Sequence, residues 1–144
     1  MPRNAVIPAV YMALVRDDRV LMLRRAGSGY ADGLLSLPAG HVEQGERVTH
    51  AAIRELREEI GVVAERLSVF GVMHRNGGDS ERVDFFLDCE SWRGEPRICE
   101  PGKCSELVWV VLDALPHDVL DYVAIAVTHP REQASWFIEY GWDR

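Results

Sequence analysis

The chain has 144 residues, with 16 lysines and arginines against 23 aspartates and glutamates, which gives a formal net charge of −7 at pH 7. A chain of this length can bury a hydrophobic core of its own, so we expect one domain over residues 1–144. The negative charge argues against a nucleic acid polymer as partner, because binding polymer phosphates requires a basic surface. It is compatible with a small phosphorylated ligand that binds together with divalent cations.

The cysteines and the apolar N-terminal run indicate a reduced, cytoplasmic chain. Cys89, Cys99 and Cys104 are odd in number and form no C-x-x-C pair, a pattern that favours free thiols. The apolar run at residues 5–15 contains Pro8 and leads directly into the charged turn RDDR, so we interpret it as a buried strand rather than a signal peptide. No other segment approaches the length of a membrane span, and we expect no membrane contact.

Strand-like and helix-like patterns alternate along the chain. Runs typical of strands occur at residues 7–15, 20–24, 67–73, 83–89 and 107–112. The first two flank a short polar turn and predict a hairpin, whereas a polar loop at 90–106 separates the last two. Helical patterns cover about 46–60, which ends at Gly61, and 119–128, and a short aromatic segment at 135–140 closes the chain. Mixed strands with two helices predict an α/β or α+β domain.

The first predicted helix carries crowded carboxylates beside its apolar face. At about 100° per residue, one stripe of the helix is made of residues suited to the core, namely Thr49, Ala52, Ile53, Leu56 and Ile60. Glu55, Glu58 and Glu59 form a second stripe next to it. Like charges four residues apart cost roughly 0.2–0.5 kcal/mol per pair, and carboxylates in the last turn face the negative end of the helix dipole. The helix is therefore either a solvated face held by Glu–Arg pairs or a site for a divalent metal, whose preferred ligands are oxygens.

The wider pattern around this helix matches a known family signature. Gly40 is followed after five residues by Glu46, and after seven more by the run RELREEIGV. This matches the signature of the Nudix hydrolase family, G-x5-E-x7-R-E-U-x-E-E-x-G-U with U aliphatic, at every defined position. Weaker similarity to MutT-like members runs through LMLRR, LSLPAG and WRGEP. The chain thus closely resembles a Nudix hydrolase of the MutT-like kind.

The resemblance implies a fold, an activity and a set of metal ligands. Family members share an α/β/α sandwich with a mixed β-sheet, in which the signature forms a loop–helix–loop. They hydrolyse a nucleoside diphosphate linked to a further group and use Mg²⁺ or Mn²⁺. Carried over by position, the metal ligands are Glu58 and Glu59, the backbone carbonyl of Gly40, and Glu55 as a further ligand or the general base.

Further catalytic residues are implied by the same resemblance. Glu46 and Arg54 are expected to support the site, with Arg54 orienting the acidic cluster through a salt bridge. MutT-like relatives contribute another glutamate from the loop before the last main strand, and aligning on WRGEP places Glu100 there, with Glu106 as a nearby substitute. Glu100 could equally be an ordinary loop carboxylate. The general base is therefore left open between Glu55 and Glu100.

Substrate contacts are implied less directly. In MutT-like relatives an arginine at the end of the second strand contacts the phosphates, which points to Arg24 and Arg25, although exposed arginines at a strand end are the alternative. Arg75 and Arg82 are weaker candidates of the same kind. Relatives often carry an asparagine that reads the base near the start of the C-terminal helix. Here Asp118 lies at or next to that place, and its carboxylate would accept hydrogen bonds from an amino-bearing base edge.

The aromatic residues and histidines give little further guidance. Tyr30 and Trp92 could stack on a base, but aromatic residues more often belong to the core. His74 is the only histidine that we treat as a candidate. The expected function is hydrolysis of a nucleoside triphosphate, ribo or deoxy, to the monophosphate and pyrophosphate by a monomer or homodimer. The alternatives are hydrolysis of ADP-ribose or a dinucleoside polyphosphate, and a nucleotide-binding regulatory module without catalysis.

Overall fold

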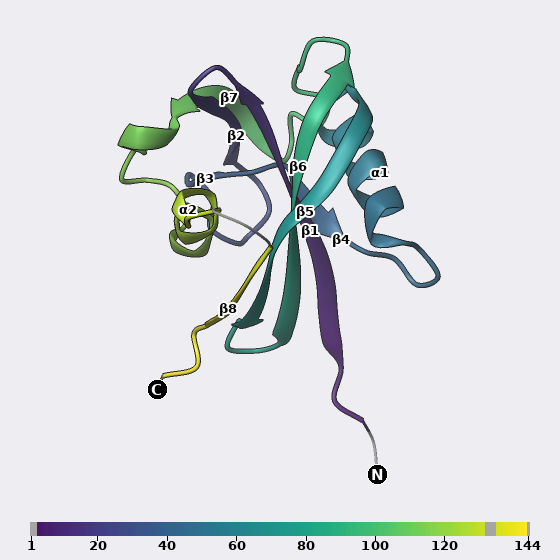
Figure 1. Cartoon of the computed structure of the whole chain (residues 1–144), viewed down its shortest axis with the longest axis vertical. Coiled ribbons are helices and arrows are strands. Elements are labelled where there is room, and N and C mark those ends of the chain that lie inside the picture. Colours follow the sequence, from purple (N-terminus) through teal and green to yellow (C-terminus); the bar gives the residue numbers. More distant parts are fainter. Residues whose placement is uncertain (1–2, 132–134, 144) are drawn as a thin grey trace.

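The computed structural model describes residues 3–131 and 135–143, and these form a mixed β-sheet with a helix on each face. The strands are β1 (Val6–Arg16), β2 (Arg19–Arg25), β3 (Leu35–Ser36), β4 (Ala39–His41), β5 (Val63–Asn76), β6 (Glu81–Arg93), β7 (Cys104–Val111) and β8 (Trp136–Tyr140). The helices are α1 (Val48–Ile60), the 3₁₀ turn η1 (Leu112–Ala114) and α2 (Asp121–Thr128). Figure 1 shows α1 and α2 on opposite sides of the sheet, as expected for an α/β/α sandwich.

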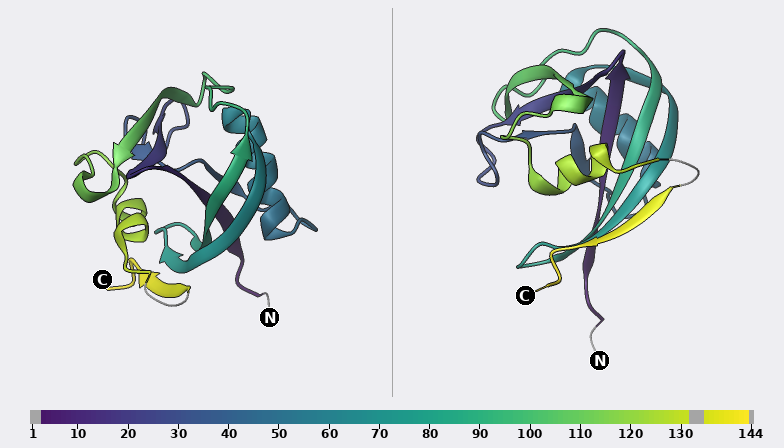
Figure 2. Two further views of the ribbon diagram at one scale, coloured as in Figure 1. Left: turned by 45° about the horizontal axis from the view of Figure 1, so that its top comes forward. Right: turned by 60° about the vertical axis from the view of Figure 1, so that its left-hand side comes forward.

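The sheet combines parallel and antiparallel pairs. Its strand order is β3-β2-β1-β6-β5-β8, with β4 paired to β1 and β7 paired to β2. The pairs β1–β6 and β5–β8 are parallel, whereas the remaining pairs are antiparallel. The long strands β5 and β6 curve strongly around the molecule (Figure 2). Register shifts between them accompany this curvature, since β-bulges increase local bend and twist.

Two hydrophobic cores lie on the two faces of the sheet. Successive side chains of β1 point to opposite faces, as in any strand. Val10, Met12 and Leu14 pack in the core under α1, whereas Tyr11 and Ala13 pack in the core under α2. The first predicted strand is therefore buried on both sides, which explains its nearly continuous apolar sequence.

Helix α1 follows the predicted pattern with two differences. Ala52, Leu56 and Ile60 are buried as expected, but Thr49 is exposed and Ile53 is only half-buried, whereas Ala51 joins the core. Thr49 belongs to the first turn, which adjoins the exposed loop before the helix. The helix ends at Gly61, whose φ of 70° is left-handed and whose N–H donates to the carbonyl of Arg57 at 3.1 Å. Glycine adopts this conformation without the steric cost of a side chain.

The predicted hairpin is confirmed, and several other boundaries differ. Val15 pairs with Val20 and Arg16 with Arg19 around a two-residue turn. The segment predicted as a polar loop at 90–106 is partly strand, because β6 extends to Arg93 and β7 starts at Cys104. The three cysteines are free thiols. No helix in the described part of the chain is long and apolar enough to cross a membrane.

Candidate active site

A cavity of about 680 Å³ opens between the two helices at one edge of the sheet. Its walls come from β1, β4, the end of α1, the adjoining parts of β5 and β6, the start of α2, and the loops that carry Tyr30 and Glu100. Its lining combines glutamates with basic and phenolic side chains. The cavity therefore offers groups suited to a cation and others suited to an anionic or aromatic ligand.

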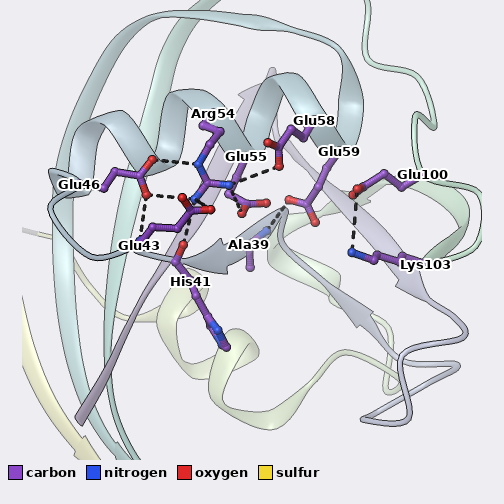
Figure 3. Close-up of polar contacts among 10 residues, drawn as sticks. All are labelled: Ala39, His41, Glu43, Glu46, Arg54, Glu55, Glu58, Glu59, Glu100 and Lys103. Atoms are coloured by element: carbon purple, nitrogen blue, oxygen red, sulfur yellow. Dashed lines mark hydrogen bonds and ion pairs between the residues drawn. The ribbon is translucent and has the colours of Figure 1, made fainter. Parts of the chain in front are cut away.

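The acidic wall gathers the predicted glutamates in one place. Glu55, Glu58 and Glu59 reach the cavity from the last turns of α1, and Glu100 reaches it from the loop before β7. Figure 3 shows their carboxylates side by side above β4. The helical spacing of the signature explains the first three, because residues three and four apart share one face. Glu100 is 40 positions or more away in the chain and is brought in by the fold.

Arg54 links four acidic groups and a backbone carbonyl of this wall. Its Nε and Nη2 donate to the two carboxylate oxygens of Glu46 at 2.8 and 3.0 Å. Its Nη1 donates to Glu55 at 2.8 Å and to Glu58 at 3.3 Å (Figure 3). Nη2 also donates to the carbonyl of His41 at 3.0 Å and lies 3.8 Å from Glu43. The guanidinium thus fixes the loop before α1 and the carboxylates on α1 relative to one another.

The glutamates differ strongly in their environment. Burial raises the pKa of Glu59 well above its ordinary value, and the neighbouring Glu55 adds to the rise, although the N–H of Ala39 donates to Glu59 at 3.0 Å and opposes it. Burial also raises the pKa of Glu55 against the opposing effect of Arg54. By contrast, the hydrogen bonds from Arg54 lower the pKa of Glu46 to about 2. Desolvation therefore outweighs the compensating contacts of Glu55 and Glu59, whereas Arg54 holds both carboxylate oxygens of Glu46.

Gly40 is placed directly against the carboxylate of Glu55. Gly40 pairs with Val10 in the β1–β4 ladder, which brings its backbone close to α1. A Cβ at this position would collide with the side chain of Glu55. The absence of a side chain at Gly40 is therefore required for the observed position of Glu55, and it leaves the backbone of Gly40 exposed to the cavity.

The loop that carries Glu100 is attached to the end of α1. The N–H of Arg97 donates to the carbonyl of Ile60 at 3.0 Å, and the N–H of Cys99 donates to the carbonyl of Glu59 at 3.1 Å. These bonds satisfy carbonyls that have no partner within the helix. Glu100 itself pairs with Lys103 at 4.0 Å. The position of Glu100 is therefore set by the same helical turn that presents Glu59.

The chemistry of these donors fits a divalent cation. Carboxylate and carbonyl oxygens are the ligands that Mg²⁺ and Mn²⁺ use, and the desolvated carboxylate of Glu59 would gain from a nearby cation. Within the described residues no three acidic, histidine or cysteine side chains already converge as a ligand set, and Arg54 and the Ala39 N–H hold several of the carboxylate oxygens. Mg²⁺ commonly takes one or two protein carboxylates together with waters and substrate phosphates. A complete protein cage is therefore not needed for the fit.

Basic side chains line the cavity near its mouth. Arg25 donates through Nε to the carbonyl of Tyr30 at 2.9 Å and lies over its ring at 5.4 Å. Arg82 contacts His41 through Nη1 at 3.2 Å from Nε2. Burial lowers the pKa of His41, and the charge of Arg82 lowers it further. Lys103 is a further basic residue of the cavity, but it lies beside Glu100 on the acidic wall.

Three tyrosines also line the cavity, of which Tyr11 and Tyr122 are buried and Tyr30 is exposed. The hydroxyl of Tyr122 lies 3.4 Å from that of Tyr11 and 3.3 Å from that of Tyr30. Arg75 lies over the ring of Tyr122 at 3.9 Å and pairs with Asp84. Sequence reasoning missed Tyr11 and Tyr122, since a tyrosine in an apolar strand or helix carries no signal that distinguishes a cavity wall from the core.

Not every sequence-predicted residue lines the cavity. Arg25 and Tyr30 do, whereas Arg24 and Asp118 do not. Adjacent strand residues point to opposite faces, and Arg24 turns away to bind Glu106 at 2.7 Å and Asp118 at 2.8 Å. The hydrogen bond from Arg24 lowers the pKa of Asp118. The carboxylate of Asp118 is thus engaged with Arg24 and not directed at the ligand cavity.

Two other aromatic or histidine candidates also lie elsewhere. Trp92 stacks near Trp109 at a centroid distance of 6.5 Å, and neither lines the cavity. His74 packs against Trp142 at 4.8 Å. His41, which follows Gly40 directly in the sequence, is the histidine that lines the cavity instead.

Comparison with known proteins identifies the family. The family model described as the NUDIX domain matches residues 6–128 of the chain. The chain belongs to the Nudix hydrolase family. Its acidic wall is built by the Nudix signature, from Gly40 through the end of α1, and Glu100 joins this Nudix helix from a separate loop.

Individual Nudix relatives agree with this assignment and differ among themselves in activity. The 8-oxo-dGTP diphosphatase of Escherichia coli K12 is 29% identical over 111 residues, covering 74% of this chain and 86% of that protein. The ADP-ribose pyrophosphatase of Methanocaldococcus jannaschii is 36% identical over 127 residues, covering 85% of this chain and 72% of that protein. The crystal structure of a MutT NUDIX hydrolase from Burkholderia pseudomallei superposes with a TM-score of 0.80 at 30% identity, covering 86% of this chain and 97% of that one. The predicted Nudix fold is therefore confirmed.

Proposed function

We propose that the protein is a Mg²⁺- or Mn²⁺-dependent nucleoside triphosphate pyrophosphohydrolase that releases the nucleoside monophosphate and pyrophosphate. The observation that carries this proposal is the meeting of five glutamates with Arg25, Arg82 and Lys103 around one cavity. The similarity to the 8-oxo-dGTP diphosphatase supports a triphosphate as substrate. The free thiols and the acidic charge are consistent with a cytoplasmic, single-domain enzyme that acts on small nucleotides as a monomer or homodimer.

The acidic wall would hold the metal. Glu58 and Glu59 are the proposed main ligands, assisted by Glu55, Glu100 and the carbonyl of Gly40. Bound there, Mg²⁺ or Mn²⁺ would neutralise phosphate oxygens and lower the pKa of a coordinated water. Arg54 would keep Glu55 and Glu58 in place while substrate binds, because it already holds both.

The basic residues would orient the polyphosphate. Arg25 and Arg82 line the cavity together with Lys103, which lies beside Glu100, and Arg82 contacts His41. A phosphate chain bound between these groups would have its negative charge balanced on both sides. Such positioning accounts for much of the catalysis of phosphoryl transfer, which requires little covalent chemistry from the protein.

The general base is proposed to be Glu55 or Glu100. Burial raises the pKa of Glu55, which suits a base that works near neutral pH, but Arg54 engages one of its oxygens. Glu100 is less enclosed, with a side-chain exposure of 35%. The variant that loses turnover while it retains metal binding, Glu55→Gln or Glu100→Gln, identifies the base.

A metal-dependent hydrolysis screen tests the function. The panel contains ribo- and deoxynucleoside triphosphates, oxidised triphosphates, ADP-ribose, NADH and diadenosine polyphosphates, with products separated by chromatography. We expect the monophosphate and pyrophosphate from a triphosphate, and loss of this turnover in Glu58→Gln and Glu59→Gln. Glu65→Gln is the matched control, because Glu65 is an exposed glutamate that pairs with Arg93 outside the cavity. Full turnover in the Glu58 and Glu59 variants would contradict the assignment.

Hydrolysis of ADP-ribose is the second candidate. It is favoured by the similarity to the archaeal ADP-ribose pyrophosphatase and by a second cavity of about 270 Å³ that shares Tyr30, Arg75 and Tyr122 with the first. That second cavity would provide space for a substrate with two bulky ends. Turnover of ADP-ribose alone would select this candidate, whereas nucleotide binding without any turnover would indicate a regulatory module.

A further inference from the structure

Arg75 is fixed in position at the deep end of the cavity. Its side chain is 5% exposed, and its Nε donates to Oδ2 of Asp84 at 2.7 Å. Asp84 is itself fully buried on β6. The guanidinium also lies 3.9 Å from the centre of the Tyr122 ring. An ion pair on one edge and an aromatic ring on one face leave the group little freedom, so it is a preorganised hydrogen-bond donor.

One edge of this donor remains for a ligand. The Nη2 of Arg75 lies 3.5 Å from Oδ1 of Asp84 and 3.4 Å from the hydroxyl of Tyr11. Across residues 3–131 and 135–143, no protein group accepts a hydrogen bond from Nη1, although Arg75 lines both cavities. A guanidinium has five N–H donors and accepts none. Because Arg75 lines both cavities and its Nη1 has no acceptor among the described residues, Nη1 can donate to a ligand that supplies an acceptor.

The surroundings indicate which kind of acceptor this is. The charge of Arg75 is balanced by Asp84, and the nearby side chains Tyr11, Tyr30 and Tyr122 are uncharged and aromatic. A phosphate would instead be met by the cations that have no such buried partner, at the cavity mouth. A planar, uncharged group with acceptor atoms on its edge matches this environment better, and a nucleobase is such a group.

We propose that Arg75 is a specificity-determining residue that donates to a carbonyl oxygen on the edge of the nucleobase. This rests on the triphosphatase function proposed above and adds the class of base. The favoured substrates are oxopurine nucleotides, in which O6 can accept from Nη1. Adenine presents an amino group in place of O6, and its N–H groups would face the N–H groups of Arg75. The preference is opposite to the one expected from Asp118, whose carboxylate is held by Arg24.

Inosine and adenosine nucleotides provide the sharpest comparison, because the C6 substituent and the protonation of N1 are their only differences. We expect kcat/KM for ITP to exceed that for ATP by about 10- to 150-fold, the discrimination that one hydrogen bond from a charged donor provides. Binding of IMP and AMP to the wild-type protein, measured by calorimetry, should show a preference in the same direction. The binding experiment needs neither a variant nor turnover.

Arg75→Lys tests the residue itself. Lysine keeps the positive charge next to the buried Asp84, so the fold is retained, but it loses the planar fork. We expect the ITP to ATP ratio of kcat/KM to fall toward one in this variant. Arg66→Lys is the matched control, since Arg66 is an arginine on the same strand with 73% side-chain exposure and no contact with the cavity. It should leave the ratio unchanged.

The outcomes separate this inference from the proposed function. Equal turnover of ITP and ATP together with equal binding of IMP and AMP overturns the role of Arg75 and leaves the triphosphatase function intact. An unchanged ITP to ATP ratio in Arg75→Lys also overturns it. If no triphosphate is hydrolysed, the proposed function fails. In that case the ratio of IMP to AMP binding is the test of the role of Arg75, and a ratio near one overturns the inference.

Discussion

Replacing Gly40 with alanine should displace Glu55 without disturbing the fold. An alanine Cβ would lie 2.6 Å from Cγ of Glu55 and closer still to its carboxylate, whereas ordinary van der Waals contact begins at 3.4 Å. Glu55 must therefore retreat by about 0.8 Å or more. A shift of this size takes its 2.8 Å bond with Arg54 to the limit of hydrogen bonding. Gly40 has no positive φ, so the backbone itself tolerates alanine.

The expected consequence is a large loss of activity with a small loss of stability. A misplacement of about 1 Å in a catalytic group can cost on the order of 10²-fold in rate. The neighbour that must move is the end of a flexible side chain, so the stability cost should stay near the low end of the roughly 1–3 kcal/mol seen for overpacking. For a chain of this size, about 1 kcal/mol corresponds to a Tm change of about 2–4 °C. We therefore expect kcat to fall roughly 100-fold while Tm falls by about 4 °C or less.

The assay compares metal-dependent hydrolysis and thermal unfolding in matched variants. Gly102→Ala is the control, because Gly102 has no positive φ and an added Cβ there meets no atom within 4 Å. The control should match the wild type in both measurements. A Gly40→Ala protein that keeps kcat/KM within about threefold of the wild type, well short of the expected loss, would refute the reasoning. Glu55 would then not need its observed position.

Three further changes test the fold and the site. Leu56→Ala removes a fully buried side chain from the core under α1 and should cost about 2–5 kcal/mol, measured by urea unfolding; a loss below about 1 kcal/mol would contradict the packing. Arg54 lowers the pKa of Glu46 to about 2, so this group stabilises the fold above its unfolded-state pKa of about 4.3 and ceases to do so as pH falls toward its folded pKa. In Glu46→Gln the unfolding midpoint should therefore fall less steeply with decreasing pH than in the wild type. An unchanged pH profile of the midpoint would show that the Arg54–Glu46 pair does not contribute. Arg25→Gln should raise KM more than Arg24→Gln, because only Arg25 lines the cavity; equal effects in steady-state kinetics would place both arginines at the substrate.

Local sequence patterns were sufficient to predict the elements that local chemistry determines. The hairpin of β1 and β2 follows from two apolar runs around a charged turn, and α1 follows from its periodicity and its terminal glycine. The short strands β3 and β4 have no such pattern, because each exists only through pairing with a distant strand. Likewise, the last residues of β6 and the first residues of β7 are polar in sequence. They form strands because each segment pairs with a neighbouring strand.

The same distinction holds for the site. The signature glutamates could be placed on one face from their spacing alone, and the structure brings them together with Glu100. Asp118 was assigned by position, but its pairing with Arg24 depends on contact between segments 94 residues apart. Arg75 and Tyr122 form part of the cavity through a contact that no local spacing predicts. Long-range side-chain pairing is therefore what sequence patterns leave undetermined.

The attachment of the Glu100 loop to α1 has a consequence for how this loop can vary among related proteins. Both bonds are donated by backbone N–H groups, those of Arg97 and Cys99, and the Arg97 side chain adds a longer contact of 3.5 Å to the carbonyl of Gly61. Because the two backbone bonds do not depend on side chains, a change of side chain at Cys99 would leave Glu100 where it is. Proline is the exception, since it has no N–H to donate. An insertion between the adjacent residues Cys99 and Glu100 would also move the carboxylate of Glu100 away from the helix end.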